Sequence, residues 1–328
     1  MKQYKWVPLF GEIEVKRDSL RFQGKLVEPA ADSSSTEAAQ PPTSVPTVGL
    51  VLCDHYLTDG SVSTTVEFEE VGPSTGCEIV VDYDVDTKGF VSAGVTGFEF
   101  GMFSIREWYP GAGGTQGQAD QPRWIPYSIA GDRANLRAHQ KYELKATLYG
   151  SRLTLEVDGV AVAVATLRAT RTGRHQIGLW FLSHSSITVR DFKVDSEKPR
   201  AFVVMQFSAP YDDVYSEVIK SVSDRFTLET IRADELYGPG LIVGDVIDQI
   251  ARAQLIIADI TPVNANVYFE VGYALALSKP MILLAKKGTQ LPFDVSGFRV
   301  LFYEDSIAGK ARIEEGLTRH IRAILGPS

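Results

Sequence analysis

The pattern of apolar and polar residues divides the chain into two parts. From Lys2 to about Asp195, short runs alternate between apolar and polar positions and end at turn residues, as in residues 61–69 and 78–84. Alternation with a period of two is typical of β-strands that place one face against a core. We therefore predict that residues 1–195 form an all-β sandwich.

The last strands of this first part have the most distinctive order. An Asp158-Gly159 pair separates two strand-like runs, which predicts a tight hairpin. Two further runs, residues 176–181 and 187–194, are expected to close the domain. In this order the segment resembles the concanavalin or laminin-G type of sandwich. The resemblance implies a jelly-roll or lectin-like fold across most of residues 1–195.

The pattern changes after the charged, proline-containing segment 195–200. Apolar runs of strand length then alternate with amphipathic helical segments, which predicts a parallel sheet with right-handed crossovers. Five strands favour an α/β, flavodoxin-like sheet over residues 200–328, with strand order 2-1-3-4-5 and a ligand site where strands one and three end. The expected strands are 201–207, 228–231, 255–258, 281–284 and 299–302, and the expected helices are 211–226, 242–253, a segment from Asn266, and 307–325.

Two carboxylates flank the loop that follows the third of these strands. Asp259 ends the strand, and Glu270 falls on the first turns of the next helix. Asn266 precedes Glu270 by four residues and Tyr273 follows it by three, so helical geometry places all three on one side. A carboxylate near a helix N-terminus can simply favour the helix dipole. That explanation accounts for one carboxylate and leaves the other polar side chains unexplained, so we favour a functional site.

The segment ADITPVNANVYFEVGYALALSKP, residues 258–280, also carries a resemblance. With it, residues 200–328 resemble the nucleoside 2-deoxyribosyltransferase family and its TIR-like relatives. The resemblance implies that Glu270 is the catalytic carboxylate, acting as nucleophile or oxocarbenium stabiliser at C1′ of a ribosyl group. Transferases of this family carry a tyrosine just after the first strand, where this chain has Gln206 and Phe207. Hydrolysis of NAD or another nucleotide is therefore favoured over base exchange.

The chemistry of such a reaction suggests further roles. Cleavage of an N-glycosidic bond develops positive charge on the sugar, so a carboxylate held beneath C1′ stabilises the transition state. Asp259 is the second candidate catalytic residue, and with Asn264 or Asn266 it is expected to bind ribose hydroxyls. The other candidate substrate-binding residues are Gln206, Phe207, Tyr273, Asp245, Arg232 and Gly240, of which Arg232 and Gly240 are candidates for a phosphate contact.

Composition and charge disfavour several classes of protein. Of the 328 residues, 44% are hydrophobic and 23% charged, and no apolar run approaches the roughly 20 residues of a membrane helix. The first residues, interrupted by Pro8 and Gly11, do not resemble a secretory signal. The net charge of −8, without a basic stripe, disfavours binding to long nucleic acids. Cys53 and Cys77 are expected to be buried thiols, and the scattered histidines do not support a metal site.

Two functions remain in competition. The leading hypothesis is an N-glycosidase that acts on a nucleotide, with NAD as the first candidate, and that is gated by the sandwich. Such a protein would suit a bacterial stress or phage-defence effector. The alternative is a module that binds a nucleotide signal without cleaving it, with the sandwich as output or assembly domain. In both cases we expect a cytoplasmic protein that needs no cofactor and can form homo-oligomers.

The sandwich could itself recognise a carbohydrate or a protein. Trp108 and Trp124 flank a polar loop, where aromatic rings either stack on a ligand or pack against the sandwich. Carbohydrate hydrolysis by the sandwich has the least support. Its acidic residues are expected to face solvent without forming an acid–base pair, and they are Asp82, Asp84, Asp86 and Glu99.

Overall fold

The computed structural model describes residues 4–28, 44–96, 101–111, 121–168, 175–235, 242–291, 295 and 297–325. These residues form two compact units. The first contains most of the chain up to Ser196, and the second contains Glu197–Ser328 together with short segments that include Tyr149–Arg152. Within the second unit, the Ser151 N–H and hydroxyl both donate to the Ala251 carbonyl, at 3.1 Å each.

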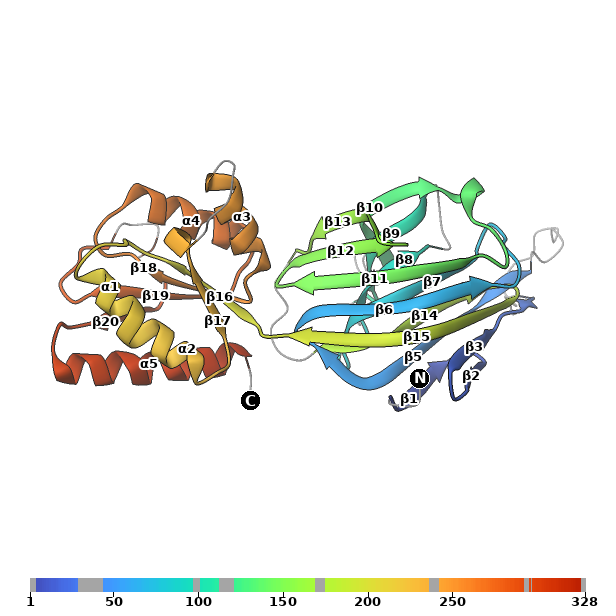
Figure 1. The fold of residues 1–328 in the computed structure, drawn as a ribbon, viewed down its shortest axis with the longest axis horizontal. Coiled ribbons are helices and arrows are strands. Elements are labelled where there is room, and N and C mark those ends of the chain that lie inside the picture. The colour runs from blue at the N-terminus through green and yellow to red at the C-terminus, as the bar shows by residue number, and fades with distance from the viewer. Residues whose placement is uncertain are drawn as a thin grey trace. The chain divides into compact units, whose positions relative to one another are not determined.

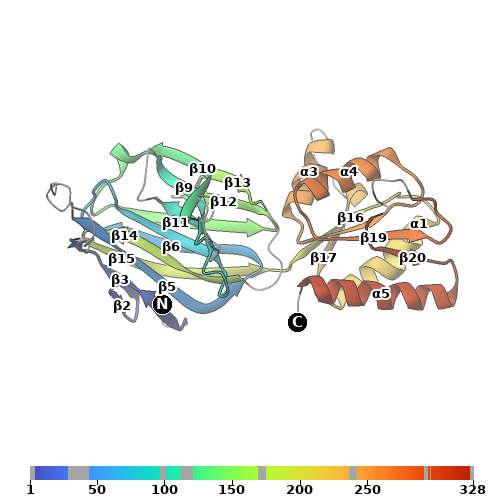
Figure 2. The same cartoon turned by 180° about the vertical axis from the view of Figure 1, so that it is seen from behind.

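The first unit is a β-sandwich, and Figure 2 shows its two layers of strands. One sheet has the strand order β1-β5-β14-β7-β8-β9-β10, with β4 paired to β5, and the other has the order β13-β12-β11-β6-β15-β3-β2. The first sheet contains β1 (Trp6–Phe10), β4 (Leu26–Val27), β5 (Val45–Leu57), β7 (Gly76–Tyr83), β8 (Phe90–Val95), β9 (Gly101–Tyr109), β10 (Arg123–Asp132) and β14 (His175–Ser183). The second contains β2 (Ile13–Val15), β3 (Ser19–Gln23), β6 (Asp59–Phe68), β11 (Lys141–Tyr149), β12 (Arg152–Val157), β13 (Val160–Thr166) and β15 (Ser186–Glu197), and a 3-10 turn, η2 (Arg133–Asn135), follows β10. The predicted all-β sandwich is confirmed.

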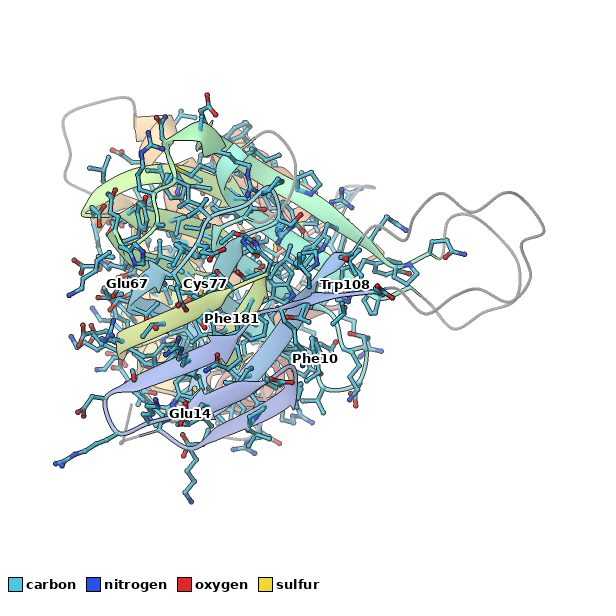
Figure 3. The ribbon with its side chains drawn as sticks, turned by 90° about the vertical axis from the view of Figure 1, so that its right-hand side faces the viewer. Phe10, Glu14, Glu67, Cys77, Trp108 and Phe181 are labelled. Carbon is cyan, nitrogen blue, oxygen red and sulfur yellow. The ribbon has the colours of Figure 1, made fainter. Side chains whose placement is uncertain are left out.

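The main core of the sandwich lies between its two sheets. Along β6 the side chains alternate between buried and half-buried, as the period-two pattern predicts. Phe22 of β3 stacks on Phe181 of β14 with ring centroids 5.2 Å apart, and this pair joins the two sheets. Figure 3 places Phe181 on its strand among the densely packed side chains of this unit.

The first sheet carries a second apolar cluster. Every residue of β7 and β8 is buried, so both faces of these strands are covered. The cluster includes Leu50, Leu52, Val80, Tyr83, Phe90, Trp180 and Leu182, with Trp108 and Trp124 packed against it. Trp108 and Trp124 are cross-strand neighbours on β9 and β10, with ring centroids 5.2 Å apart. These two rings therefore pack against the sandwich, one of the two roles predicted for them.

Asp82 corrects one expectation. Predicted to face solvent, it is only 3% exposed, and its Oδ1 lies 2.8 Å from Nδ1 of His175. The β7–β8 register shifts at this point, so simple alternation fails to predict which side chains point inward. Asp84 lies in the turn after β7, where its Oδ1 accepts the Asp86 N–H at 2.8 Å, and Glu99 lies outside the described residues.

The second unit contains a five-stranded parallel sheet, seen edge-on in Figure 1. Its order is β17-β16-β18-β19-β20, with all four neighbouring pairs parallel. The strands are β16 (Arg200–Val204), β17 (Glu229–Arg232), β18 (Leu255–Asp259), β19 (Met281–Lys286) and β20 (Val300–Tyr303). The first strand lies between the second and the third, so the strand order reverses there, as predicted.

Helices cover both faces of this sheet (Figure 1). One face carries α3 (Ile242–Arg252) and α4 (Ala265–Ala276). The other carries α5 (Ile307–Leu325) and a helical run made of α1 (Tyr211–Asp213), the π-helix η3 (Val214–Lys220) and α2 (Ser221–Asp224), while a 3-10 turn, η4 (Ala233–Glu235), follows β17. Each face has its own apolar core. None of the described helices is long and apolar enough to span a membrane.

Candidate functional site

One side chain ties the N-terminus of α4 to the end of β16. Asn264 has an extended backbone, and its Oδ1 accepts the Asn266 N–H at 2.9 Å, which is the geometry of an N-cap. Its Nδ2 donates to Gln206 Oε1 at 2.6 Å. Gln206 follows β16 and Asn264 follows β18, so this contact lies at the carboxyl edge of the sheet where the strand order reverses. Two predicted substrate-binding residues are thus in direct contact.

Glu270 occupies the second turn of α4. Val267 and Val271 point into the core, so the helical repeat leaves Glu270 on the flank of that face, beside Asn266 and Tyr273. Burial raises the pKa of the half-buried Glu270 side chain to about 7. Within the described part of the chain, its carboxylate has no hydrogen-bond or ion-pair partner. A desolvated carboxylate without a partner is typical of a functional site.

Asp259 lies at the end of β18, as predicted, but its side chain is fully buried. Oδ2 accepts a hydrogen bond from the Tyr303 hydroxyl at 2.8 Å, and Oδ1 accepts the Thr261 N–H at 2.9 Å. Burial outweighs these hydrogen bonds and raises the pKa of Asp259 to about 6. Both oxygens are thus directed at protein groups, a geometry that holds the β18–α4 loop rather than a ribose hydroxyl.

Arg232 lies at the end of β17, again as predicted, and belongs to an ion-pair network. Its guanidinium donates to Asp234 at 2.6 Å and to Asp212 at 2.8 Å. The same group lies 4.3 Å from the ring centroid of Tyr215, and the Arg232 side chain is 9% exposed. Two carboxylates therefore neutralise its charge, and the geometry does not favour the predicted phosphate contact.

The remaining predicted residues are dispersed. Phe207 is 52% exposed, with its ring centroid 6.0 Å from the Arg232 guanidinium carbon. Asp245 is exposed on the first turn of α3. Gly240 lies outside the described residues. Among the described residues, the structure therefore brings together Gln206, Asn264 and Asn266 by hydrogen bonds, and places Glu270 and Tyr273 along the same helix.

Tyr303 is the residue that sequence reasoning missed. It ends β20, and its hydroxyl reaches across the sheet edge to Asp259, 44 residues earlier in the chain. Burial raises the pKa of Tyr303 above its ordinary value, and the negative charge of Asp259 and the hydrogen bond to it add to the rise. No local sequence pattern marks this pair, because only the order of the strands brings the two residues together.

The second unit also contains a cavity of about 620 Å³ beside Tyr303. Its walls come from η3, the ends of β19 and β20, and the start of α5, so it lies on the α1–α5 face of the sheet and Glu270 does not line it. Among the described residues, no group of three His, Cys, Asp or Glu side chains is arranged to hold a metal ion. The cavity and Glu270 therefore lie on opposite faces of the sheet and form two separate candidate sites.

Comparison with known proteins finds no matching family model and no matching curated protein. A carbohydrate-binding module, CBM66 from Bacillus subtilis, matches at 11% identity with a TM-score of 0.40, over 58% of this chain and 95% of that one. A Bacillus subtilis protein of unknown function with a galectin-like fold matches at 12% identity and 0.38, over 59% and 89%. The TIR domain of the Toll-related receptor TRR-2 from Hydra magnipapillata matches at 15% identity and 0.32, over 37% and 97%. At such low values these likenesses carry no argument about function.

Proposed function

We propose that this chain is an N-glycosidase that cleaves the bond between base and ribose in a nucleotide, with NAD as the first candidate substrate. Glu270 is the proposed catalytic carboxylate. The observation that carries the proposal is its environment: half-buried, unpaired within the described part of the chain, and with a pKa raised by burial to about 7. It also lies on the helix that begins where ligands bind in open parallel sheets.

The proposed reaction uses this environment directly. The bond between C1′ and the base nitrogen breaks, and its electron pair leaves with the base. The ionised Glu270 carboxylate stabilises the positive charge that develops on the ribose, or captures C1′ as a covalent intermediate. Water then supplies the hydroxyl at C1′, and its proton passes to the base or to solvent. A fixed carboxylate away from bulk water stabilises such a charge more strongly than a solvated one.

The neighbouring groups support this arrangement. Asn266 lies one turn before Glu270 on α4 and is exposed, so its amide is a proposed partner for a ribose hydroxyl. Gln206 and Asn264 are proposed to bind the substrate at the end of β16, and Tyr273 to flank the ring. Asp259 takes a positioning role in the proposal, since Tyr303 and Thr261 already occupy its oxygens.

The test is release of free base. Purified full-length protein is incubated with NAD and with a panel of ribonucleotides and deoxyribonucleotides, and nicotinamide or base is quantified by liquid chromatography. We expect release by the wild type and a loss of about a thousandfold or more in Glu270→Gln. Glu315→Gln is the matched control, because Glu315 is an exposed glutamate on α5 whose side chain is 70% accessible. Equal turnover by a folded Glu270→Gln variant would exclude Glu270 as the catalytic group.

A non-catalytic nucleotide-binding module is the second candidate. It is favoured by the state of Asp259, because the second carboxylate at this sheet edge is buried and hydrogen-bonded rather than free to act as an acid. This alternative predicts saturable nucleotide binding with the ligand recovered unchanged. Chromatography of the same incubations distinguishes the two, since a binding module releases no base.

The sandwich is proposed as the recognition part of such a protein, binding a carbohydrate or a protein and regulating the second unit. Trp108 and Trp124 are both half-buried rather than fully buried, and they are the proposed aromatic contacts for a ligand. Regulation of this kind would suit a cytoplasmic stress or phage-defence effector that works as a homo-oligomer. Binding to a panel of glycans, followed by tryptophan fluorescence, tests the carbohydrate part of the proposal.

A further inference from the structure

The cavity beside Tyr303 has walls suited to a flat ring. Val214, Val218 and Ile313 provide apolar surface, and the aromatic residues Tyr211 and Tyr303 also line it. Its volume of about 620 Å³ falls within the range of small-molecule sites. The Tyr303 hydroxyl is held by Asp259, so Tyr303 is fixed in place in the wall.

The charged groups around the cavity determine which ligands fit. Four carboxylates and two ammonium groups line it. One of the carboxylates, Glu304, pairs with Lys287 outside the lining at 2.6 Å, which leaves a net charge of −1. Glu217 and Lys310 neutralise each other at 2.7 Å. Asp213, Asp305 and Lys286 have no ion-pair partner in the described part of the chain, so two unpaired carboxylates face one unpaired ammonium group. Repulsion from these carboxylates disfavours phosphate-bearing ligands and favours neutral or cationic ones.

The helix that forms one wall is itself unusual. Val214–Lys220 is a π-helix of seven residues, inserted between the α-helical segments α1 and α2. Such segments are rare and occur frequently at functional sites, because the wider turn redirects side chains. This one contributes Val214, Glu217 and Val218 to the cavity wall. The irregular helix and the cavity thus occupy the same place, which is independent support for a functional role.

We propose that this cavity is a binding site for a planar nitrogen heterocycle that is neutral or singly cationic and carries no phosphate, such as a free nucleobase or a pyridine derivative. The ring would stack against Tyr211 and Tyr303, and Asp213 or Asp305 would accept hydrogen bonds from ring nitrogens or the exocyclic amine. The site is separate from Glu270. It stands whether or not the chain is an N-glycosidase.

Calorimetric titration of the full-length protein tests this proposal with three probes: adenine, nicotinamide and the N-methylnicotinamide cation. AMP serves as the phosphate-bearing comparison. Val214→Trp fills the cavity, whereas Ser216→Trp adds the same ring on an exposed position of the same helix. We expect at least one probe to bind both the wild type and Ser216→Trp. Its affinity for Val214→Trp should be at least about tenfold lower, and AMP should bind more weakly than this probe in every variant.

Asp305→Lys provides a second variant that cannot fail by misfolding the core, because Asp305 is exposed. It should weaken the cationic probe by about tenfold while nicotinamide, which is neutral, changes less. Glu315→Gln, at an exposed position on α5, should bind the probes as the wild type does. The proposal is overturned if no probe binds up to about 10 mM, the weak limit for fragments. It is also overturned if a folded Val214→Trp binds the probes normally, or if Asp305→Lys leaves the affinity for the cationic probe unchanged.

Discussion

Gln206 and Asn264, 58 residues apart in the chain, share a hydrogen bond of 2.6 Å between Oε1 and Nδ2. The same Asn264 side chain caps α4 through its Oδ1. One amide group therefore fixes both the start of the helix that carries Glu270 and its distance from the end of β16. Because the two bonds use different atoms of Asn264, substitutions can remove them separately.

Asn264→Ala removes both bonds, and we expect it to destabilise the second unit by about 1 to 2 kcal/mol. Asn264→Asp should cost about 0.5 kcal/mol or less, because aspartate is an equally good N-cap and the Gln206 amide can rotate to donate to it. Both losses can be measured by urea denaturation monitored by the circular dichroism of the helices, since the described α-helices all lie in this unit. Equal losses in the two variants would show that the cap has no energetic role.

Glu270 should make stability depend on pH in a specific direction. Its pKa is raised from 4.5 to about 7 in the folded state, so the folded protein holds a proton that the unfolded chain has lost between these values. The free energy of unfolding then falls as pH rises through this range. Glu270→Gln removes the effect, so it should be more stable than the wild type above pH 7, by about 1 kcal/mol after allowing for solvent screening.

The control for this prediction is the low-pH limit. Below about pH 4.5 the wild-type carboxyl is protonated in both states, so its difference from Glu270→Gln should vanish. Glu315→Gln, at an exposed position, should follow the wild type at every pH. Urea melts at three pH values would detect the pattern, and a constant difference at all three would mean that ionisation is not its cause.

Activity should also depend on the ionisation of Glu270, but it should rise with pH where stability falls. The proposed mechanism needs an ionised Glu270, and its pKa of about 7 means that the ionised fraction rises as pH increases through neutrality. We therefore expect kcat/KM for base release to rise about tenfold per pH unit on the acid side and to level off above pH 7. A profile already flat from about pH 5 upward would indicate that a different group limits the rate.

The fold could be predicted from sequence because it depends on local periodicity. The two strands around Asp158 and Gly159 were placed by alternation, and both turn residues adopt the positive φ angles, 50° and 78°, of a tight hairpin. The five strands of the parallel sheet lie within a few residues of their expected positions. Cys53 and Cys77 are free and buried, as predicted for two thiols on strands of the sandwich.

The site could be predicted only in part. Glu270 was placed on the flank of α4 because its position follows from helical spacing alone. The partners of Asp259 and Arg232 depend on contacts between separate elements, which periodicity does not encode. For Asp82, a register shift defeated the alternation rule. What could not be predicted is therefore how buried charges are paired, not where the elements lie.

Tyr303→Phe removes the hydrogen bond between Tyr303 and Asp259, and we expect it to destabilise the second unit. The variant leaves Oδ2 of Asp259 buried without a donor, which should cost about 1 to 3 kcal/mol. Because this hydrogen bond lowers the pKa of Asp259, its loss should raise that pKa beyond about 6. The free energy of unfolding then falls over a wider pH range as pH rises. The variant should therefore lose more stability relative to the wild type at pH 8 than at pH 4. Tyr211→Phe is the control, since Tyr211 lines the same cavity.

Arg106 should be essential to the sandwich for an electrostatic reason. It forms the buried ion pair with Glu78 at 2.7 Å, and its guanidinium lies over Trp124 at 3.7 Å. Arg106→Met leaves a fully buried carboxylate without its counter-ion, at an expected cost of about 3 to 5 kcal/mol. The double variant Arg106→Met with Glu78→Gln should recover much of that loss, because no charge remains unpaired. Tryptophan fluorescence during urea denaturation follows this unit alone, since all four tryptophans precede residue 196. A double variant as unstable as the single one would assign the loss to packing against Trp124 rather than to charge.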